Sequence, residues 1–451
     1  MKKITKKKMW VFALGQFGWA ILGGIITNWL VYFYAPEQET INLGHKLYLT
    51  QGAVVFGVFT IVGLVTMGSR IFDAFTDPLI ATVSDKSRHR LGRRIPFLRY
   101  AAFPFALVTV LVFVLPTDGI SMLNNVWFTV MLLLFYLFMT MYCTPFNALI
   151  PELGKTQDDK INISTYISIT FILGTALAYS SPFIWDMLIG SGIERMTAIR
   201  ITFGMLAFIA LLLMWVPAFF IKESDYTDTT PSNTDTFKSL TKTFKNKSFQ
   251  TFVASDIFYW IALTLFQTGL PFFVTTLLGL EETMVTMYFL VMTVTSFLFY
   301  MPVNALAKKI GKKKLVVVGF SAFALVFAFS MFIGLYGFSV VAQGYIMAIA
   351  AAIPMAILGI LPQAIVADIA QADALTTGEN RGGMFYAART FSFKLGQAVS
   401  MLIFTSLATI GAGSGLGYRV ALGFAVLFTL IGALILTRYN EKKVLEILEV
   451  K

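Results

Sequence analysis

Twelve apolar runs constrain the fold of this 451-residue chain more than any other feature. A helix needs about 20 residues to cross the ~30 Å hydrocarbon core of a bilayer. Hydrophobic residues make up 57% of the chain and charged residues 13%, a balance unlike that of soluble proteins. We therefore predict an all-α membrane protein with twelve transmembrane helices. The expected spans are residues 9–34, 49–84, 97–116, 122–150, 163–189, 199–221, 248–278, 283–306, 315–335, 340–369, 383–410 and 417–436.

A long polar segment divides these spans into two groups of six. Two equal halves are typical of secondary transporters, in which a midplane site lies between bundles that rock against each other. A short loop with a glycine followed by paired basic residues occurs after the second span and again after the eighth. The predicted parts are an N-terminal six-helix bundle (1–221), a cytoplasmic linker (222–247), a C-terminal six-helix bundle (248–438) and a cytoplasmic tail (439–451).

The distribution of lysine and arginine predicts the orientation of the spans. Basic residues concentrate in the N-terminus, the loops and the tail that an even number of spans places on one side. Only Lys46, Arg195, Arg200 and Arg419 are expected on the other side. Because cytoplasmic loops carry the excess of Lys and Arg, both termini are predicted to be cytoplasmic. The net charge of +11 follows from this topology and gives no reason to expect nucleic acid as a partner.

Cysteine and histidine usage excludes several kinds of chemistry. Cys143 is the only cysteine, so the chain has no intrachain disulfide and no cysteine-based metal cluster. His45 and His89 both fall in loops, which leaves no histidine for a proton relay inside the membrane. We therefore expect no enzyme, no cofactor and no metal beyond a possible Na⁺ site; a membrane-embedded enzyme or a channel is a remote alternative.

The second span carries an unusual concentration of charge. Asp73 and Asp77 are four residues apart and share a helix face, with Thr76 beside them. Charges at bilayer depth are costly and usually face the protein interior or a water-filled path. A paired acidic site of this kind is interpreted first as a cation site. The alternative is that Arg70, three residues before Asp73, only neutralises it.

Motifs spread over both halves carry a resemblance to a known family. They are residues 70–78 of the second span, the loop 87–97, the segment 145–152, residues 366–369 and residues 394–396. On these residues the chain resembles the glycoside-pentoside-hexuronide:cation symporters, typified by melibiose permease, of the major facilitator superfamily. The resemblance implies that superfamily's fold and coupled transport of a small molecule with a cation.

The resemblance also implies a coupling site. Asp73, Thr76, Asp77 and Thr140 correspond to the cation ligands, with Na⁺ as the expected ion and H⁺ or Li⁺ as alternatives. Oxygen ligands of this kind suit hard cations. The coupling charges are expected to be Arg70, Arg389 and Lys394, with Lys394 approaching the aspartates across the bundle interface. Alternatively, Lys394 and Arg389 extend toward lipid headgroups or close a static salt bridge.

The substrate side departs from melibiose permease, because Ala20 and Cys143 stand where that protein has sugar-binding aspartates. The remaining candidates are polar or aromatic residues of helices whose counterparts line the cavity, and each aromatic can equally be a packing residue. The predicted substrate contacts are Gln16, Trp19, Asn28, Trp29, Tyr142, Cys143, Asn147 and Gln363.

Charged residues near cytoplasmic helix ends are candidates for gating. Glu152 and Asp368 are expected to pair with Arg94 or Arg381 in one transport state and to release them in another. Simple solvated or helix-capping charge is the alternative.

Together these features predict a secondary active transporter that couples symport of a sugar or glycoside to Na⁺ or H⁺ by alternating access. A Na⁺-coupled lysophospholipid carrier is the alternative, since such carriers keep the acidic pair and the lysine without the sugar carboxylates. The compact, prokaryotic-looking chain favours a sugar and a multi-pass place in a bacterial cytoplasmic membrane. The expected partners are the substrate, the cation and membrane lipids, and we expect a monomer.

Overall fold

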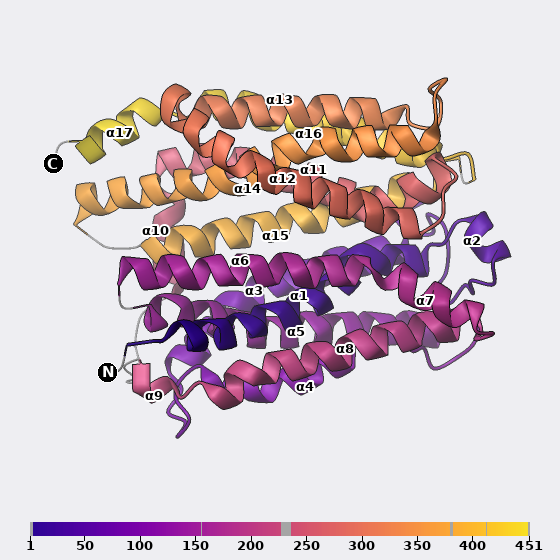
Figure 1. Ribbon diagram of the computed structural model, residues 1–451, viewed down its shortest axis with the longest axis horizontal. Coiled ribbons are helices and arrows are strands. Elements are labelled where there is room, and N and C mark those ends of the chain that lie inside the picture. Colours follow the sequence, from indigo (N-terminus) through magenta and orange to yellow (C-terminus); the bar gives the residue numbers. More distant parts are fainter. Residues whose placement is uncertain (1–2, 155, 227–235, 379–381, 412, 450–451) are drawn as a thin grey trace. The chain divides into compact units, whose positions relative to one another are not determined.

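The computed structural model describes all residues except 1–2, 155, 227–235, 379–381, 412 and 450–451. All regular secondary structure in the described part of the chain is helical (Figure 1). The chain divides into two compact units, one formed by residues 1–57 and 64–235 and the other by residues 58–63 and 236–451. Part of the predicted linker lies outside the described residues.

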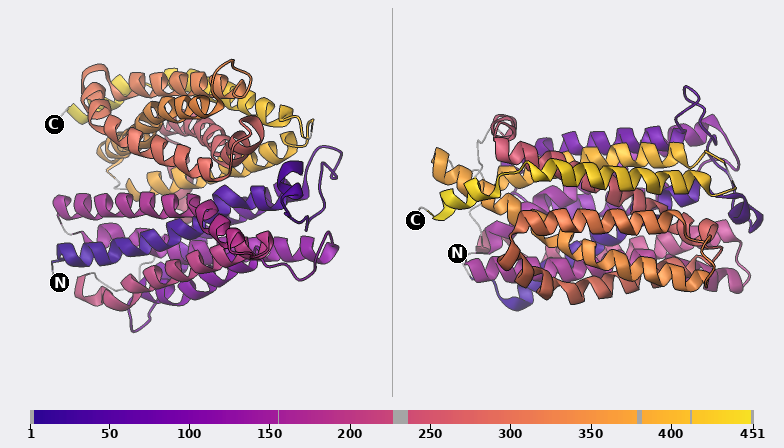
Figure 2. Two further views of the ribbon diagram at one scale, coloured as in Figure 1. Left: turned by 45° about the vertical axis from the view of Figure 1, so that its right-hand side comes forward. Right: turned by 90° about the horizontal axis from the view of Figure 1, so that it is seen from above.

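The first unit is built from long helices joined by short loops. The helix α1 packs against α6 and α8, and α4 packs against α5 and α8. Figures 1 and 2 show these helices lying side by side along most of their length. The helices of this unit are α1 (Lys6–Tyr34), α2 (Gln38–Asn42), α3 (Ile61–Asp85), α4 (Ile95–Leu111), α5 (Met122–Leu153), α6 (Gln157–Tyr179), α7 (Ser181–Gly190), α8 (Arg195–Phe220) and α9 (Glu223–Tyr226).

The second unit repeats this plan. The helix α11 packs against α15 and α16, while α13 packs against α14 and α16 (Figure 2). Its helices are α10 (Thr236–Phe244), α11 (Lys247–Phe272), α12 (Thr283–Ile310), α13 (Lys312–Met331), α14 (Val340–Thr377), α15 (Gly382–Leu407), α16 (Leu416–Thr437) and α17 (Glu441–Glu449). A π-helical turn, Phe273–Leu277, extends α11.

The prediction of twelve spans is confirmed by this helix inventory. Nine segments of the described chain are long and apolar enough to cross a membrane by length and composition. The other three spans correspond to α4, which is apolar but has only 17 residues, and to α3 and α15. The last two carry the intramembrane charges, which lower their hydropathy. The protein is therefore a multi-pass membrane protein.

One span boundary was predicted wrongly, and one span contains a helix break that was not predicted. The second span was expected to begin at residue 49, but α3 begins at Ile61, because the preceding stretch turns at Gly52 and Gly57, which both have positive φ. The fifth span, expected over 163–189, lies within one candidate membrane span, Asp158–Gly190, in which α6 ends at Tyr179 and α7 begins at Ser181. Pro182 lies in the first turn of α7, where its missing N–H costs no helical hydrogen bond.

Small residues let the helices of the first unit approach closely. A Cβ atom at Gly18 of α1 would lie 2.5 Å from the carbonyl oxygen of Ala210 on α8. A Cβ atom at Gly174 of α6 would lie 2.7 Å from the carbonyl oxygen of Phe17 on α1. Close backbone approach through small residues is a main source of helix association in lipid. α1 is thus held on two sides by backbone contacts that larger side chains would prevent.

The loop after α2 contains a buried histidine. The His45 side chain is 2% exposed, and its Nε2 lies 2.9 Å from the carbonyl oxygen of Phe33, which makes Nε2 the donor. Its Nδ1 is buried, and no described residue forms a hydrogen bond with it. Burial, with a smaller contribution from the nearby Arg195 charge, lowers the pKa of His45 from 6.5 to about 4.

This histidine predicts acid sensitivity of the fold. The unfolded chain takes up a proton near pH 6.5 while the folded protein resists protonation until about pH 4. Stability is therefore expected to fall as the pH drops through that window, by about 3 kcal/mol in total if the shift is fully expressed. Thermal unfolding of the wild type and of His45→Gln between pH 7 and 4 measures this. A wild type and a variant with the same pH dependence would show that His45 does not contribute.

Candidate functional site

Two aspartates of α3 face two threonines of α5. Asp73 is fully buried, and its Oδ1 accepts a hydrogen bond of 2.7 Å from Thr140 Oγ1. One turn further along both helices, Asp77 Oδ1 accepts a hydrogen bond of 3.0 Å from Thr144 Oγ1. The spacing of four residues repeats on both helices, so the two hydrogen bonds form successive rungs between them. The first bundle thus holds two carboxylates and two hydroxyls together inside the membrane.

Thr76 adds a third hydroxyl to the first rung. Its Oγ1 lies 3.0 Å from the backbone oxygen of Asp73 and 3.4 Å from Thr140 Oγ1. The side chain is 6% exposed. The predicted ligands Asp73, Thr76, Asp77 and Thr140 are therefore neighbours in the structure.

Thr144 is a site residue that the sequence reasoning missed. The available signal was its spacing, because Thr140 and Thr144 are four residues apart, as Asp73 and Asp77 are. An i, i+4 pair of hydroxyls on one span matches an i, i+4 pair of carboxylates on another.

Arg70 lies beside this cluster but is too far from Asp73 for a hydrogen bond. Its Nη1 is 3.8 Å from Asp73 Oδ2, which is an ion-pair distance but too long for a hydrogen bond. Its guanidinium also lies over the ring of Tyr136, 4.8 Å from the ring centroid. This cation–π contact holds Arg70 away from direct hydrogen bonding with the carboxylate. Arg70 therefore offsets part of the negative charge and leaves the oxygens grouped.

The donor set of this cluster consists of oxygen atoms. Hard cations such as Na⁺ prefer carboxylate and hydroxyl oxygens. Among the described residues no group of three or more His, Cys, Asp or Glu side chains is placed to hold a metal ion. The chemistry of the cluster thus suits a monovalent cation or a proton.

In the second unit, Arg389 of α15 pairs with Asp256 of α11. Arg389 Nε and Nη2 donate hydrogen bonds of 2.7 Å and 2.9 Å to the two carboxylate oxygens. Both side chains are at most 5% exposed. From the sequence, Asp256 has no motif support and is expected at most to be an additional polar contact, so its pairing with Arg389 was not predicted. The predicted coupling residue Lys394 lies on the same helix and is 8% exposed.

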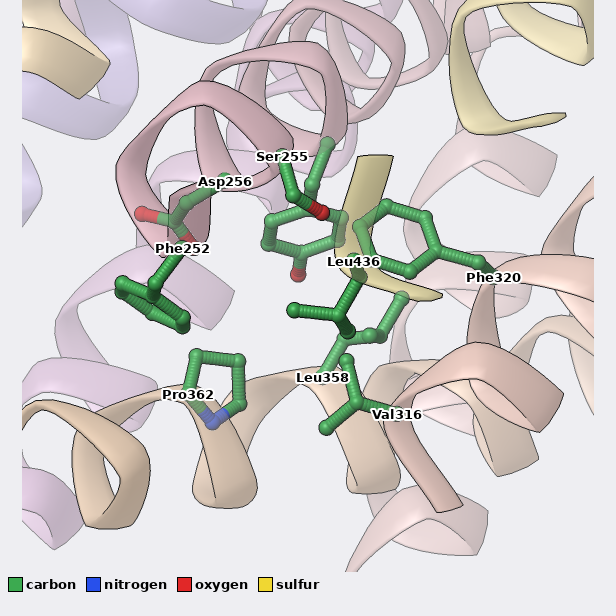
Figure 3. A pocket seen from close by; sticks show the side chains of 9 residues that line it. Phe252, Ser255, Asp256, Val316, Phe320, Leu358, Pro362 and Leu436 are labelled. Carbon is green, nitrogen blue, oxygen red and sulfur yellow. The ribbon is translucent and has the colours of Figure 1, made fainter. Parts of the chain in front are cut away.

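Asp256 also borders a small cavity of the second unit (Figure 3). Most of the lining is apolar, and Ser255 Oγ donates its hydrogen bond of 2.7 Å to the carbonyl oxygen of Gly432. The carboxylate of Asp256 and the hydroxyl of Ser255 are thus both engaged with protein atoms. The lining residues are Phe252, Ser255, Asp256, Tyr259, Val316, Phe320, Leu358, Pro362 and Leu436.

Two predicted substrate contacts are engaged in packing. Trp29 is 1% exposed, and its Nε1 donates a hydrogen bond of 2.8 Å to the carbonyl oxygen of Ala178. Tyr142 is 0% exposed, and its hydroxyl donates a hydrogen bond of 2.9 Å to the carbonyl oxygen of Met214. Their polar atoms tie together helices of the first bundle, which leaves their assignment to substrate without structural support.

The other predicted substrate contacts differ in exposure. Two buried nitrogens, Trp19 Nε1 and Asn28 Nδ2, form no hydrogen bond within the described part of the chain. Such groups are uncommon in folded proteins. By exposure, Gln16 and Asn28 are buried, Trp19 and Cys143 are half-buried, and Asn147 and Gln363 are exposed.

The predicted gating residues lie in ion pairs within their own units. Arg94 contacts Asp85, and its Nη2 lies 3.3 Å from Glu152 Oε1. Arg93 Nη2 lies at the same distance from that oxygen. The predicted contact of Glu152 with Arg94 is thus present.

In the second unit, the acid predicted to act in gating has a different partner from the expected one. Asp368 Oδ2 lies 2.5 Å from Lys312 Nζ, at the start of α13. Arg381, the partner expected from sequence, lies outside the described residues. Lys312 belongs to the repeated glycine-basic loop, so each unit pairs that loop with an acid.

Sequence reasoning missed Glu223, which caps α4. The carboxylate of this buried residue accepts backbone hydrogen bonds of 2.9 Å from Arg93, 2.8 Å from Arg94 and 3.0 Å from Ile95. A helix N-terminus has unsatisfied N–H groups and a positive dipole end, so an anion there is doubly favourable. Glu223 thereby joins the segment after α8 to the start of α4.

Removing this cap is expected to destabilise the first unit. For Glu223→Ala we expect a loss of about 2 kcal/mol, the upper end for a cap, because three N–H groups lose a charged acceptor. Thermal unfolding measures the loss. Asp158→Asn is the matched control, since Asp158 is an exposed acid in the first turn of α6. Equal melting temperatures for the two variants would contradict the capping role.

Comparison with known proteins agrees with this architecture. A family model described as "MFS/sugar transport protein" matches residues 11–438. An uncharacterised symporter of Synechocystis sp. is 24% identical over 472 aligned residues, covering 87% of this chain and 83% of the relative. A sodium-dependent lysophosphatidylcholine symporter of Xenopus tropicalis is 35% identical over 117 residues, covering 25% of this chain and 22% of the relative.

A solved structure shows the same fold. The crystal structure of a D-xylose–proton symporter superposes with a TM-score of 0.68 at 14% identity, covering 97% of this chain and 98% of that chain. The family match covers nearly the whole chain and both helical units. With twelve spans in two units and a symporter as a full-length relative, the chain belongs to the MFS/sugar transport protein family of the major facilitator superfamily.

Proposed function

We propose that this protein is a cation-coupled symporter that carries a sugar or glycoside across the cell membrane by alternating access. The observation that carries the proposal is the oxygen cluster of Asp73, Thr76, Asp77, Thr140 and Thr144 inside the first bundle. We propose Na⁺ as the coupling ion, with H⁺ or Li⁺ as alternatives.

The charge of this cluster supports coupling. Asp73 and Asp77 supply two carboxylates, and Arg70 lies 3.8 Å from that of Asp73. Carboxylate and hydroxyl oxygens are the ligands that a hard cation prefers. We propose that a loaded cation site favours the state that binds substrate, so that cation and substrate bind cooperatively.

A sugar is proposed as the substrate because the family model that spans the chain is described by sugar transport. A lysophospholipid is the second candidate, and the local 35% identity to the lysophosphatidylcholine symporter favours it. The chain lacks the sugar-binding aspartates of melibiose permease, because Ala20 and Cys143 stand at those positions. This absence applies to both proposed substrates.

Uptake into proteoliposomes tests the proposal. Purified protein is reconstituted and offered labelled xylose, methyl glucoside, glucuronate or lysophosphatidylcholine, with an inward gradient of Na⁺, Li⁺ or H⁺ or with none. Accumulation of a sugar above its external concentration only with a cation gradient supports sugar symport. If lysophosphatidylcholine is the only compound that accumulates, the protein is a cation-coupled lipid carrier rather than a sugar symporter. Uptake that requires internal substrate and ignores every gradient indicates an exchanger and overturns the proposal.

Lys394 is proposed as a coupling charge. Lys394→Ala is expected to reduce gradient-driven uptake at least tenfold while the protein still reaches the membrane, because a buried positive charge is lost from a transport helix. Uptake normalised to protein in the membrane measures this. Wild-type uptake in the variant would assign Lys394 a structural role.

We further propose that both termini are cytoplasmic, that the membrane is a bacterial cytoplasmic membrane, and that the protein acts as a monomer. The lysine and arginine distribution supports the orientation. Labelling of single cysteines introduced near Lys3 and Lys442 by an impermeant reagent in intact cells tests it, in a Cys143→Ser background that we expect to be nearly silent for transport.

A further inference from the structure

In the second unit, several pairs of side chains join α11 and α15 with the same sequence offset. Asp256 is hydrogen-bonded to Arg389, 133 positions later in the chain. One turn further along both helices, the ring of Trp260 stacks on the ring of Phe393 with centroids 4.5 Å apart and 25° between the planes. These residues are again 133 positions apart. The two helices therefore present matched pairs of side chains at intervals of one turn.

One more pair with this offset lies toward the far ends of the helices. Thr268 Oγ1 lies 3.3 Å from Met401 Sδ, again with an offset of 133. Thr264 lies one turn after Trp260 on α11, and Gln397 lies one turn after Phe393 on α15. Thr264 is 2% exposed and Gln397 is 9% exposed. The oxygen Oγ1 of Thr264 is buried and has no hydrogen-bond partner in the described part of the chain.

Trp260 likewise has an unused donor. Its Nε1 is buried and forms no hydrogen bond with any described residue. Other tryptophans of the protein satisfy this atom, since Trp127 Nε1 donates to the carbonyl oxygen of Leu111 at 3.0 Å and Trp215 Nε1 donates to that of Arg99 at 3.2 Å. Buried polar groups are normally paired, so neighbouring exceptions on one helix face need an explanation.

The first unit has an equivalent feature on the equivalent helix. Trp19 is the fourteenth residue of α1, and Trp260 is the fourteenth residue of α11. The ring of Trp19 contacts Phe171 of α6, with centroids 6.0 Å apart. Trp19 Nε1 is also buried without a partner among the described residues. Because an aromatic pair with an unused indole donor occurs in both halves, a local packing accident does not explain it.

We propose that Trp260, Phe393, Thr264 and Gln397 form a sugar-binding surface of the second bundle. A pyranose offers an apolar face to aromatic rings and hydroxyl oxygens that accept from an indole N–H. Its hydroxyls also exchange hydrogen bonds with a threonine hydroxyl and a glutamine amide. Such a ligand completes the hydrogen bonds that the protein leaves open at Trp260 and Thr264. This assignment rests on the proposed sugar transport and adds residues to it.

The decisive variant is Trp260→Phe. It keeps an aromatic ring against Phe393 and removes only the indole and its unused N–H. We expect at least a tenfold weaker affinity for the sugar, with little change in the melting temperature of the ligand-free protein. The stabilisation by Na⁺ alone is expected to stay as in the wild type. The matched control is Trp127→Phe, which loses a satisfied hydrogen bond and is expected to melt at lower temperature with unchanged sugar affinity.

The measurement is the thermal shift of the purified full-length protein, titrated with xylose, methyl glucoside, glucuronate or lysophosphatidylcholine at fixed Na⁺. The sugar with the largest Na⁺-dependent shift in the wild type serves as the probe. Thr264→Val, nearly isosteric and without the hydroxyl, is the second variant and decides the matter if Trp260→Phe does not fold; we expect a loss of affinity of at least threefold.

The outcomes separate this inference from the proposed function. A wild type that binds a sugar, with variants that bind it equally well, overturns the sugar-binding surface and leaves sugar transport intact. A wild type that responds to none of the sugars overturns both. Weakened sugar binding in Trp260→Phe with an unchanged Na⁺ response supports the surface.

Discussion

Asp77→Asn is expected to abolish the dependence of uptake on the cation gradient. Asp77 provides one of two carboxylates in the oxygen cluster and accepts a hydrogen bond of 3.0 Å from Thr144. Asparagine keeps the size of the side chain and its carbonyl oxygen but removes the negative charge. Loss of one charged ligand is expected to weaken cation binding about 100-fold, which corresponds to roughly 3 kcal/mol.

Two measurements check this expectation. Uptake into proteoliposomes is compared with and without a Na⁺ gradient, and the melting temperature is measured against Na⁺ concentration. Asp186→Asn is the control, because Asp186 is an exposed acid on another membrane helix of the same bundle. A variant that retains full Na⁺ stimulation would remove Asp77 from the coupling site.

The second large effect is expected from breaking the Asp256–Arg389 ion pair. Both side chains are at most 5% exposed, and two hydrogen bonds join them. Arg389→Met leaves the carboxylate buried without its partner, which is expected to cost about 3 to 5 kcal/mol. The double variant Asp256→Leu with Arg389→Met removes both charges and is expected to recover most of that loss.

Thermal unfolding of the single and double variants forms a double-mutant cycle for this pair. A double variant as unstable as the single one would mean that the pair itself, rather than the uncompensated charge, provides the stability. Uptake by the double variant separates structure from transport. If the pair is only a clamp between α11 and α15, a stable double variant is expected to retain cation-driven uptake.

The sequence by itself determined the helices and one cluster of charge. Apolar runs predict membrane spans because lipid allows little else for an exposed backbone, and twelve of them were found. The turn at residues 52–57 and the break at Ser180 were not predicted, because hydropathy does not register local backbone geometry. That Asp73 and Asp77 of α3 share one helix face was predictable from their four-residue spacing, which depends only on helix periodicity.

Only the tertiary structure decided which side chains meet. Thr144 joins the oxygen cluster because α5 packs against α3 in one rotation, and no local pattern specifies that rotation. Asp256 and Arg389 meet across 133 residues, and Glu223 reaches α4 from 128 residues away. Trp29 and Trp260 are both tryptophans of apolar helices, yet one donates to a backbone oxygen and the other keeps its donor unused. Helix periodicity is a local property that one segment carries, whereas partner choice depends on how several helices rotate and pack together, which is a property of the whole chain.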